Sequence, residues 1–384
     1  MSETLPNPLN GSEPDDAPED GEALCLSGGG YRAMLFHLGV LWRLEQAGIL
    51  SRVKRVSSVS GGSITAARLA MCWHRVQPGT PGALNRLIEQ VVVPVRALAG
   101  RTLDADAIVG GIFLPGSIGD RVAAAYRKAL FGDATLQDLP NAPRFVINAT
   151  NVQSGVLWRF SKPYMGDWRV GRVPHPDLSL ATAVAASSAF PPVLSPIEID
   201  LAPGAITPDK TADLQRPPFT TQVVLTDGGV YDNMGLETAW KRYRTLFVSD
   251  GGARLNSEEE PKTDWPRHAY RVLDVIDNQV RALRKRAIVA AFRAGADAPG
   301  GRDGAYWGIG TPFERYAGRA PGLACPPAAV AELAGVPTRL KRLDDRTQDR
   351  LINWGYAICD AAVRSHVDPT LSQPTAFPYP ATGV

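Results

Sequence analysis

Residues 22–63 read EALCLSGGGYRAMLFHLGVLWRLEQAGILSRVKRVSSVSGGS. This stretch contains two apolar, strand-like runs at residues 23–26 and 53–59, and each run ends in a turn of serine and glycine. A helix-period spacing of apolar residues follows each turn, which predicts helices over residues 31–46 and 64–74. Strands that alternate with helices in this way predict an α/β fold whose mostly parallel sheet is covered on both faces.

The first turn consists of Ser27, Gly28, Gly29 and Gly30. Consecutive glycines leave backbone N–H groups free to face an anion. A glycine triplet alone also fits a phosphate cradle or a plain turn. We therefore treat Gly28, Gly29 and Gly30 as candidate donors to an anion.

The second turn carries Ser60 between a predicted strand and a predicted helix, which is the setting of a nucleophile elbow. A serine hydroxyl needs a base to take its proton, and its attack on a carbonyl creates an oxyanion that must be stabilised. The two turns together offer the hydroxyl and the anion site. Ser60 is preferred because two glycines follow it directly, and Ser57, Ser58 and Ser63 stay as alternative hydroxyls.

The general base must come from another part of the chain, and the best candidate is Asp227. It stands at the carboxyl end of a strand predicted over residues 220–226, where open α/β sheets place their ligands. A second Asp-Gly-Gly begins at Asp250, after a strand predicted over residues 245–249. The tripeptide alone is therefore weak evidence, and it also fits a simple turn.

Together these motifs resemble the patatin-like lipid acyl hydrolases, a family that includes cytosolic phospholipases. Its members carry a glycine-rich oxyanion loop followed by an arginine, a GxSxG elbow, and a DGG or DGA that contains the catalytic aspartate of a Ser-Asp dyad. The matching residues are Gly28, Gly29, Gly30 and Arg32, Ser60, the DGGxxxN pattern from Asp227 to Asn233, and a small-residue block AASSAFPPVLSP at residues 185–196. Asp250 lacks the following asparagine. Ser58 replaces the usual first glycine of the elbow, which we regard as a minor departure because serine is small.

The resemblance implies a three-layer α/β/α fold and hydrolysis of a phospholipid or lysophospholipid through an acyl-serine intermediate. Ser60 is then the nucleophile, Asp227 the base, and Gly28, Gly29 and Gly30 the oxyanion hole. An exposed aspartate, with a pKa near ~3.9, is a feeble base, so this mechanism requires Asp227 to lie in a water-poor cleft.

Arg32 has two interpretations, since a guanidinium suits either a lipid phosphate or an internal salt bridge. Two other functions also stay open. One is an anion- or nucleotide-binding module, although the loop lacks the GK[ST] ending of a P-loop and the Rossmann spacing. The other is a catalytically silent or partner-activated member of the family.

The 384 residues are 44% hydrophobic with a net charge of +2, enough for a large core. Residues 1–22 hold seven acids and no Lys or Arg, and we expect an acidic, disordered tail over residues 1–21. No basic and apolar leader and no run near the ~18 apolar residues of a membrane span is present. We therefore expect a cytoplasmic protein, with contact to a membrane at its surface only.

The four cysteines are scattered without CxxC spacing, so we expect reduced thiols, no metal site and no cofactor. Among the five histidines, only His37 follows a motif closely enough to approach the site. Its apolar neighbours favour a packed or hydrogen-bonded structural role, and a Ser-Asp dyad requires no histidine.

We expect a catalytic domain over residues 22–256, with a further strand at 144–149, and a helical C-terminal appendix over 257–384 packed against it. A Pro-rich surface loop is expected at residues 203–218. The apolar residues 107–116 either cover the site or contact lipid, or they form a buried loop.

The appendix contains a helix predicted over residues 269–293 with a basic cluster, Arg281, Arg284, Lys285 and Arg286. Such a cluster is usually a solvated helix face, and attraction to an anionic membrane surface is the functional alternative. Nucleic acid is not expected as a partner because aromatic residues do not interleave with the charges.

Overall fold

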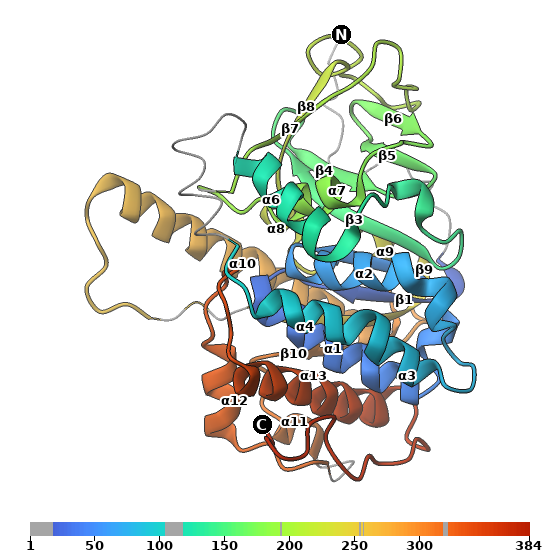
Figure 1. Cartoon of the computed structure of the whole chain (residues 1–384), viewed down its shortest axis with the longest axis vertical. Helices are drawn as coiled ribbons and strands as arrows, with labels where there is room; N and C mark the ends of the chain where they lie inside the picture. The colour runs from blue at the N-terminus through green and yellow to red at the C-terminus, as the bar shows by residue number, and fades with distance from the viewer. Residues whose placement is uncertain (1–17, 104–117, 193, 253–254, 256, 318–321) are drawn as a thin grey trace.

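The computed structural model describes residues 18–103, 118–192, 194–252, 255, 257–317 and 322–384. The expected apolar segment at 107–116 and most of the expected N-terminal tail lie outside these ranges. Residues 19–21, expected to belong to that tail, begin the first strand of the sheet. The chain forms a mostly parallel central sheet between two layers of helices (Figure 1), which confirms the three-layer α/β/α prediction.

The described strands form one sheet in the order β10-β9-β1-β2-β3-β4-β5-β6, with β7 and β8 attached to β3 through β8. Strands β10, β9, β1, β2 and β3 run parallel, whereas β4 to β8 pair antiparallel. The strands are β1 (Glu19–Leu26), β2 (Val53–Val59), β3 (Arg144–Asn151), β4 (Val156–Phe160), β5 (Tyr164–Asp167), β6 (Gly171–Pro174), β7 (Ile197–Asp200), β8 (Gln222–Asp227), β9 (Tyr243–Asp250) and β10 (Asp303–Gly308).

Helices pack against both faces of this sheet. Helix α1 follows β1 and helix α2 follows β2, as predicted from the sequence. The described α-helices are α1 (Gly30–Gln46), α2 (Gly61–Val76), α3 (Ala83–Leu87), α4 (Val93–Ala99), α6 (Ile118–Tyr126), α7 (Leu180–Ser187), α8 (Gly229–Asp232), α9 (Glu237–Trp240), α10 (Trp265–Ala294), α11 (Glu314–Ala317), α12 (Pro327–Ala334) and α13 (Asp345–His366).

The period-two pattern of β1 divides the core into two parts. Leu24 and Leu26 point into the larger core, which α1, α2 and α13 cover. Ala23 and Cys25 point to the opposite face, into a smaller core with Ile288 of α10. Because alternate side chains of a strand face opposite ways, a strand buried on both faces reads as the continuous apolar run seen in the sequence.

Strand β8 reaches the site by a route that the sequence argument did not foresee. It runs antiparallel to β3 and pairs with residues 149–151, whereas β2 pairs with residues 144–148 of β3. Asn151 pairs with β4 and with β8, so β8 lies on the edge of β3 that β2 occupies. The carboxyl ends of β2 and β8 therefore meet nearly end to end, which brings Asp227 toward Ser60.

The residues after 256 are integral to the sheet and its cover. Strand β10 pairs in parallel with β9 and extends the sheet by one strand. Helix α13 crosses α1 closely, since a Cβ at Gly39 would overlap the carbonyl oxygen of Ile352, and one at Gly355 would overlap that of Phe36. The segment expected to be a helical appendix thus supplies a strand and a core helix.

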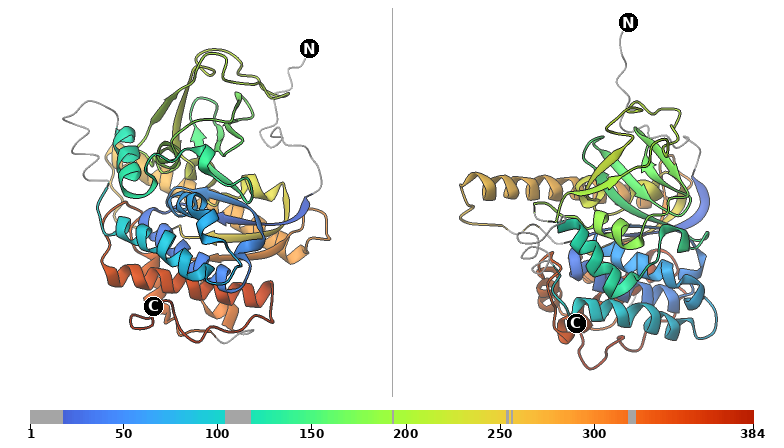
Figure 2. Two further views of the ribbon diagram at one scale, coloured as in Figure 1. Left: turned by 45° about the vertical axis from the view of Figure 1, so that its right-hand side comes forward. Right: turned by 45° about the horizontal axis from the view of Figure 1, so that its top comes forward.

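Helix α10 leaves the body of the molecule. Its second half packs on the sheet beside β10, while its first half projects outward, as Figure 1 and the right view of Figure 2 show. None of the helices in the described part of the chain combines the length and apolarity of a membrane span.

Candidate active site

Ser60 is the single residue that connects β2 to α2, and it forms a sharp turn. Its backbone has φ 51° and ψ −121°, a conformation that side chains other than glycine rarely adopt. The Ser60 N–H donates to Oγ of Ser187 at 2.9 Å, which fixes the turn, and the residue is 8% exposed. This strained strand-to-helix turn has the form expected of a nucleophile elbow.

The other serines of this region are held inside the structure. Ser57 Oγ lies 2.7 Å from Thr238 Oγ1, and Ser63 Oγ donates to Ser58 Oγ at 3.0 Å. All three are buried more deeply than Ser60. Their hydroxyls are therefore committed to internal contacts, which favours Ser60 over the three alternatives.

The glycine loop meets the elbow backbone to backbone. Gly29 and Gly30 have φ of 142° and 60°, values that glycine alone adopts readily. A Cβ at Gly61 would overlap the carbonyl oxygen of Gly30, so the first turns of α1 and α2 touch. Two helix N-termini, each with a partial positive charge, thus converge beside Ser60.

The N–H groups of this loop are not equivalent. The Gly28 N–H donates to the Asn233 carbonyl at 3.0 Å, whereas the N–H groups of Gly29, Gly30 and Gly61 have no acceptor among the described residues. The Gly28 N–H is thus already engaged, which differs from the prediction that it faces an anion together with those of Gly29 and Gly30. Gly61, the residue after the elbow serine, was not predicted as a donor, although hydrolases of this general design commonly have one there.

Asp227 lies at the end of β8 with its carboxylate buried. Oδ1 accepts the Gly229 N–H at 2.7 Å, and Oδ2 has no fully formed hydrogen bond within the described residues. Burial raises the pKa of Asp227 to about 7, against the lowering influence of the Gly229 N–H and the nearby Ser60 hydroxyl. The structure therefore brings an uncommitted carboxylate oxygen of raised basicity next to Ser60.

Asn233 joins the two motifs. Its carbonyl accepts the Gly28 N–H, and its side-chain Oδ1 lies so close to Gly28 and Gly229 that neither position has room for a Cβ. The asparagine of the DGGxxxN pattern thus locks the glycine loop against the turn that carries Asp227. Asp250, whose motif lacks this asparagine, has a different environment.

Asp250 is committed to helix α10. It accepts from Arg281 Nη2 at 3.1 Å and from the Tyr306 hydroxyl at 2.7 Å. Burial raises its pKa, but Arg281 and the Tyr306 hydroxyl outweigh burial and leave the pKa below its usual value. A carboxylate that a cation holds ionised is a poor base. Asp227 is therefore better suited than Asp250 to act as the base.

Arg32 is fully buried and acts within the protein. Its guanidinium donates to the carbonyls of Gly251 and Val336 and to Thr338 Oγ1 at 2.8 Å. Burial and the nearby Arg281 lower its pKa to about 10. These bonds tie α1 to two distant segments and favour the structural interpretation of Arg32 over phosphate binding.

His37 is also structural, as expected. Its Nδ1 lies 2.9 Å from Ser249 Oγ and its Nε2 lies 3.0 Å from the Ser27 carbonyl oxygen. Burial lowers its pKa to about 4, so the ring stays neutral near pH 7. It supports the turn before the glycine loop.

The basic cluster of α10 faces inward for the most part. Arg281 pairs with Asp250, Arg284 lies 3.4 Å from Glu237, and the Lys285 ammonium lies 4.6 Å from the centre of the Tyr306 ring. Only Arg286 of the four is exposed. The expectation of a solvated helix face is therefore wrong for the first three, which anchor α10 to the sheet.

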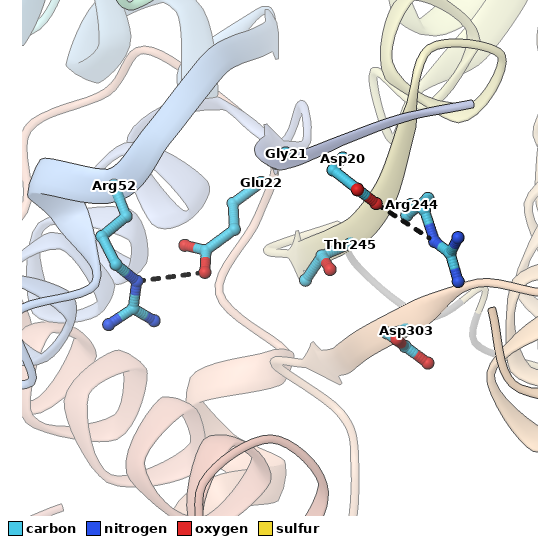
Figure 3. Close-up of a pocket in the computed structure, with 7 residues that line it drawn as sticks. All are labelled: Asp20, Gly21, Glu22, Arg52, Arg244, Thr245 and Asp303. Atoms are coloured by element: carbon cyan, nitrogen blue, oxygen red, sulfur yellow. Dashed lines mark hydrogen bonds and ion pairs between the residues drawn. The ribbon is translucent and has the colours of Figure 1, made fainter.

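A described cavity lies at the opposite end of the sheet from Ser60. It has a volume of about 600 Å³ and is lined by residues at the amino ends of β1, β9 and β10 (Figure 3). Two ion pairs lie within it, Arg52 with Glu22 at 3.1 Å and Arg244 with Asp20 at 3.5 Å. An apolar acyl chain does not suit this polar lining. No group of three or more His, Cys, Asp or Glu side chains in the described ranges is placed to hold a metal ion.

Known proteins share the family and the fold of this chain. A family model described as patatin-like phospholipase matches residues 24–240, more than half of the chain. The structure is similar to that of human GIVD cytosolic phospholipase A2, with a TM-score of 0.52 and 14% identity, over 90% of this chain and 61% of that chain. It is also similar to the complex of that enzyme with methyl gamma-linolenyl fluorophosphonate, with a TM-score of 0.51 and 15% identity, over 90% of this chain and 58% of that chain. This chain thus spans about three fifths of the length of those structures, and no curated protein matches its sequence.

Proposed function

Because the chain belongs to the patatin-like phospholipase family, we propose that it hydrolyses carboxylic esters of lipids, with a phospholipid or lysophospholipid as substrate. The observation that carries this proposal is the pairing of Ser60, in its strained turn, with the free and unusually basic Oδ2 of Asp227. A serine and a buried carboxylate suffice for acyl transfer if an oxyanion site is present.

In the first half of the reaction, Ser60 Oγ attacks the carbonyl carbon of the ester and its proton passes to Asp227 Oδ2. The N–H groups of Gly29, Gly30 and Gly61 stabilise the resulting oxyanion. The intermediate collapses when the C–O bond to the alcohol breaks, and the departing oxygen takes the proton back from Asp227. An acyl-serine remains.

In the second half, Asp227 takes a proton from a water molecule, and the water oxygen attacks the acyl carbon. Collapse of this second intermediate returns Ser60 to its hydroxyl form with the proton from Asp227 and releases the fatty acid. Each half returns the carboxylate to its starting state, so no cofactor is consumed.

Labelling with a fluorophosphonate tests the nucleophile directly. We expect one covalent adduct on Ser60 by mass spectrometry, and no adduct and no esterase activity in Ser60→Ala. Ser58→Ala is the matched control because Ser58 lies two residues away in the same motif, and it should still be labelled at Ser60. An adduct that persists in Ser60→Ala would refute the assignment, and a folded parent chain that neither reacts nor hydrolyses a short-chain ester would indicate a silent or partner-activated protein.

A further inference from the structure

Helix α10 presents an apolar stripe to the solvent. At 3.6 residues per turn the stripe members fall on one face of the helix. Trp265 is 82% exposed and Leu273 is 57% exposed, and the other members are between 36% and 52% exposed. The α10 stripe consists of Trp265, Val272, Leu273, Ile276, Val280 and Leu283.

Helix α10 differs from an ordinary surface helix, because its apolar face is exposed and charged residues face the protein. The face toward the protein carries Arg281 and Arg284, which pair with acids of the body, and only below them does Ile288 enter the core. The apolar face is exposed to solvent. The first half of the helix projects from the body of the protein (Figure 2, right). Such a continuous exposed apolar surface marks an interaction site.

Helix α10 borders the candidate active site. Tyr270 of α10 packs edge to face on Phe190, with ring centres 6.5 Å apart. The neighbour of Phe190, Ala189, accepts the Asp227 N–H at 3.0 Å. Asp277, one turn before Arg281, is near enough to Asp227 to raise the pKa of that carboxyl. The helix that carries the stripe is therefore adjacent to the groups proposed to act on the ester.

We propose that the α10 stripe lies in the surface of a phospholipid bilayer and holds the Ser60 site against it, an inference that rests on the proposed lipid hydrolysis. An amphipathic helix with basic residues on its polar sides, large apolar residues on the other and an exposed tryptophan at its end is suited to the membrane interface. No stripe member is ionisable, so burying the stripe in lipid removes no charge from water.

The charge of α10 adds a smaller contribution. Of the seven Lys or Arg in the helix, Arg281, Arg284 and Lys285 face the body of the protein. The exposed Arg267, Arg286 and Arg293 remain, and they favour an anionic surface. Residues 258–260, three glutamates just before the helix, oppose this attraction. We therefore expect the apolar stripe to dominate binding and anionic lipid to strengthen it modestly.

A binding experiment in the Ser60→Ala background separates this inference from catalysis, because the vesicles stay intact. The test variant is Leu273→Gln/Ile276→Gln, which keeps good helix formers on the stripe. The matched control is Val93→Gln/Val152→Gln, since Val93 and Val152 are 56% and 57% exposed but lie outside α10. Sedimentation with phosphatidylcholine vesicles, with and without phosphatidylglycerol, measures the partition coefficient, and circular dichroism confirms the folded state.

We expect the stripe variant to lose at least about tenfold in partition coefficient, while the control binds like its parent. Equal binding of all three chains, or no binding of the parent, would overturn the proposal. A parent that sediments as a dimer in solution, and a stripe variant that becomes monomeric yet binds vesicles normally, would assign the stripe to a second copy of this chain. If the chain with Ser60 intact hydrolyses no ester, the proposed function fails, but the vesicle result still decides the role of α10.

Discussion

The carboxylate of Asp227 is placed where water cannot compete for it. One oxygen is held by the Gly229 N–H, and the other is left for the Ser60 hydroxyl. In a dyad no histidine tunes the base, so burial has to supply the basicity that an ordinary aspartate lacks. The same burial makes the group costly to ionise, and both consequences are measurable.

The first consequence is a pH profile. Burial raises the pKa of Asp227 to about 7, and a base acts only when it is deprotonated. We expect kcat/KM on a soluble ester to rise through pH 7 and to be roughly 100-fold lower at pH 5 than at pH 8. A flat profile across this range in a folded chain would contradict a base with a raised pKa.

The second consequence concerns stability. The folded pKa of Asp227 lies above its unfolded value near ~3.9, so between these values the folded state holds a proton that the unfolded state releases. The parent chain therefore loses stability as pH rises from 4 to 7, and Asp227→Asn does not incur this loss. We expect the variant to gain on the order of 2–3 kcal/mol relative to the parent between pH 5 and pH 8, measured by urea unfolding. A pH-independent difference would mean that Asp227 titrates normally.

The two Asp-Gly-Gly sites provide an internal comparison. Asp227→Asn should lower kcat by about 10²- to 10⁴-fold with little loss of stability at neutral pH. Asp250→Asn removes the partner of Arg281 and should instead lower the melting temperature, with the rate of the folded fraction largely kept. The reverse pattern would move the base to Asp250.

Most of these residues follow from the sequence because the motifs are local. A serine before two glycines and an aspartate before two glycines specify turns whatever the rest of the chain does. The engagement of Gly28 by Asn233 and the burial of Arg32 depend on segments far away in the chain, so no local pattern could indicate them. The same holds for the choice of Asp227 over Asp250, which the sequence supported only through the following asparagine.

At the scale of elements, the basic residues of α10 act as anchors. Arg281 pairs with Asp250, and Arg284 reaches Glu237 and the Tyr231 carbonyl in the chain that follows Asp227. Helix α10, which lies outside the region matched to the family, therefore holds both Asp-Gly-Gly turns. This arrangement predicts a structural role for the cluster.

Arg281→Met should leave Asp250 buried without its cation. We expect a loss of about 3 kcal/mol in the free energy of unfolding, because the Asp250 carboxylate is then buried without a charge that compensates it. Arg286→Met, on the exposed side of the same helix, is the control and should change stability little. Equal unfolding midpoints in urea for the two variants would show that Arg281 does not anchor α10.

The elements themselves were predictable where their pattern is strong. The strand predicted over residues 53–59 coincides with β2, and the helix predicted over 269–293 lies within α10. The antiparallel strands β4 to β7 and strand β10 were missed, because strands this short offer too few positions to show a clear period. The antiparallel direction of β8 was also missed, since a strand sequence does not specify the direction of its partner.

At the scale of the whole molecule, the C-terminal helix supports the helix that begins at the glycine loop. α1 starts at Gly30 and crosses α13 through Gly39 and Gly355, where the two backbones are in contact. A buried ion pair, Arg43 with Asp360 at 2.8 Å, fixes the same crossing. The position of the candidate oxyanion donors therefore depends on residues more than three hundred positions away.

Gly355→Ala tests this dependence. The added Cβ would overlap the Phe36 carbonyl oxygen, so the helices must separate, and since α1 is rigid its N-terminal glycines must move as well. We expect a loss of about 3 kcal/mol or more in the free energy of unfolding, together with a lower kcat/KM of the chain that remains folded. Gly100→Ala is the matched control, because φ there is −73° and the nearest atom to the new Cβ, the Ala97 carbonyl oxygen, is 3.5 Å away. Urea unfolding and ester hydrolysis measured on both variants decide the point: if Gly355→Ala is as stable and as active as Gly100→Ala, the C-terminal helix is a dispensable cover and the glycine loop owes its position to the sheet alone.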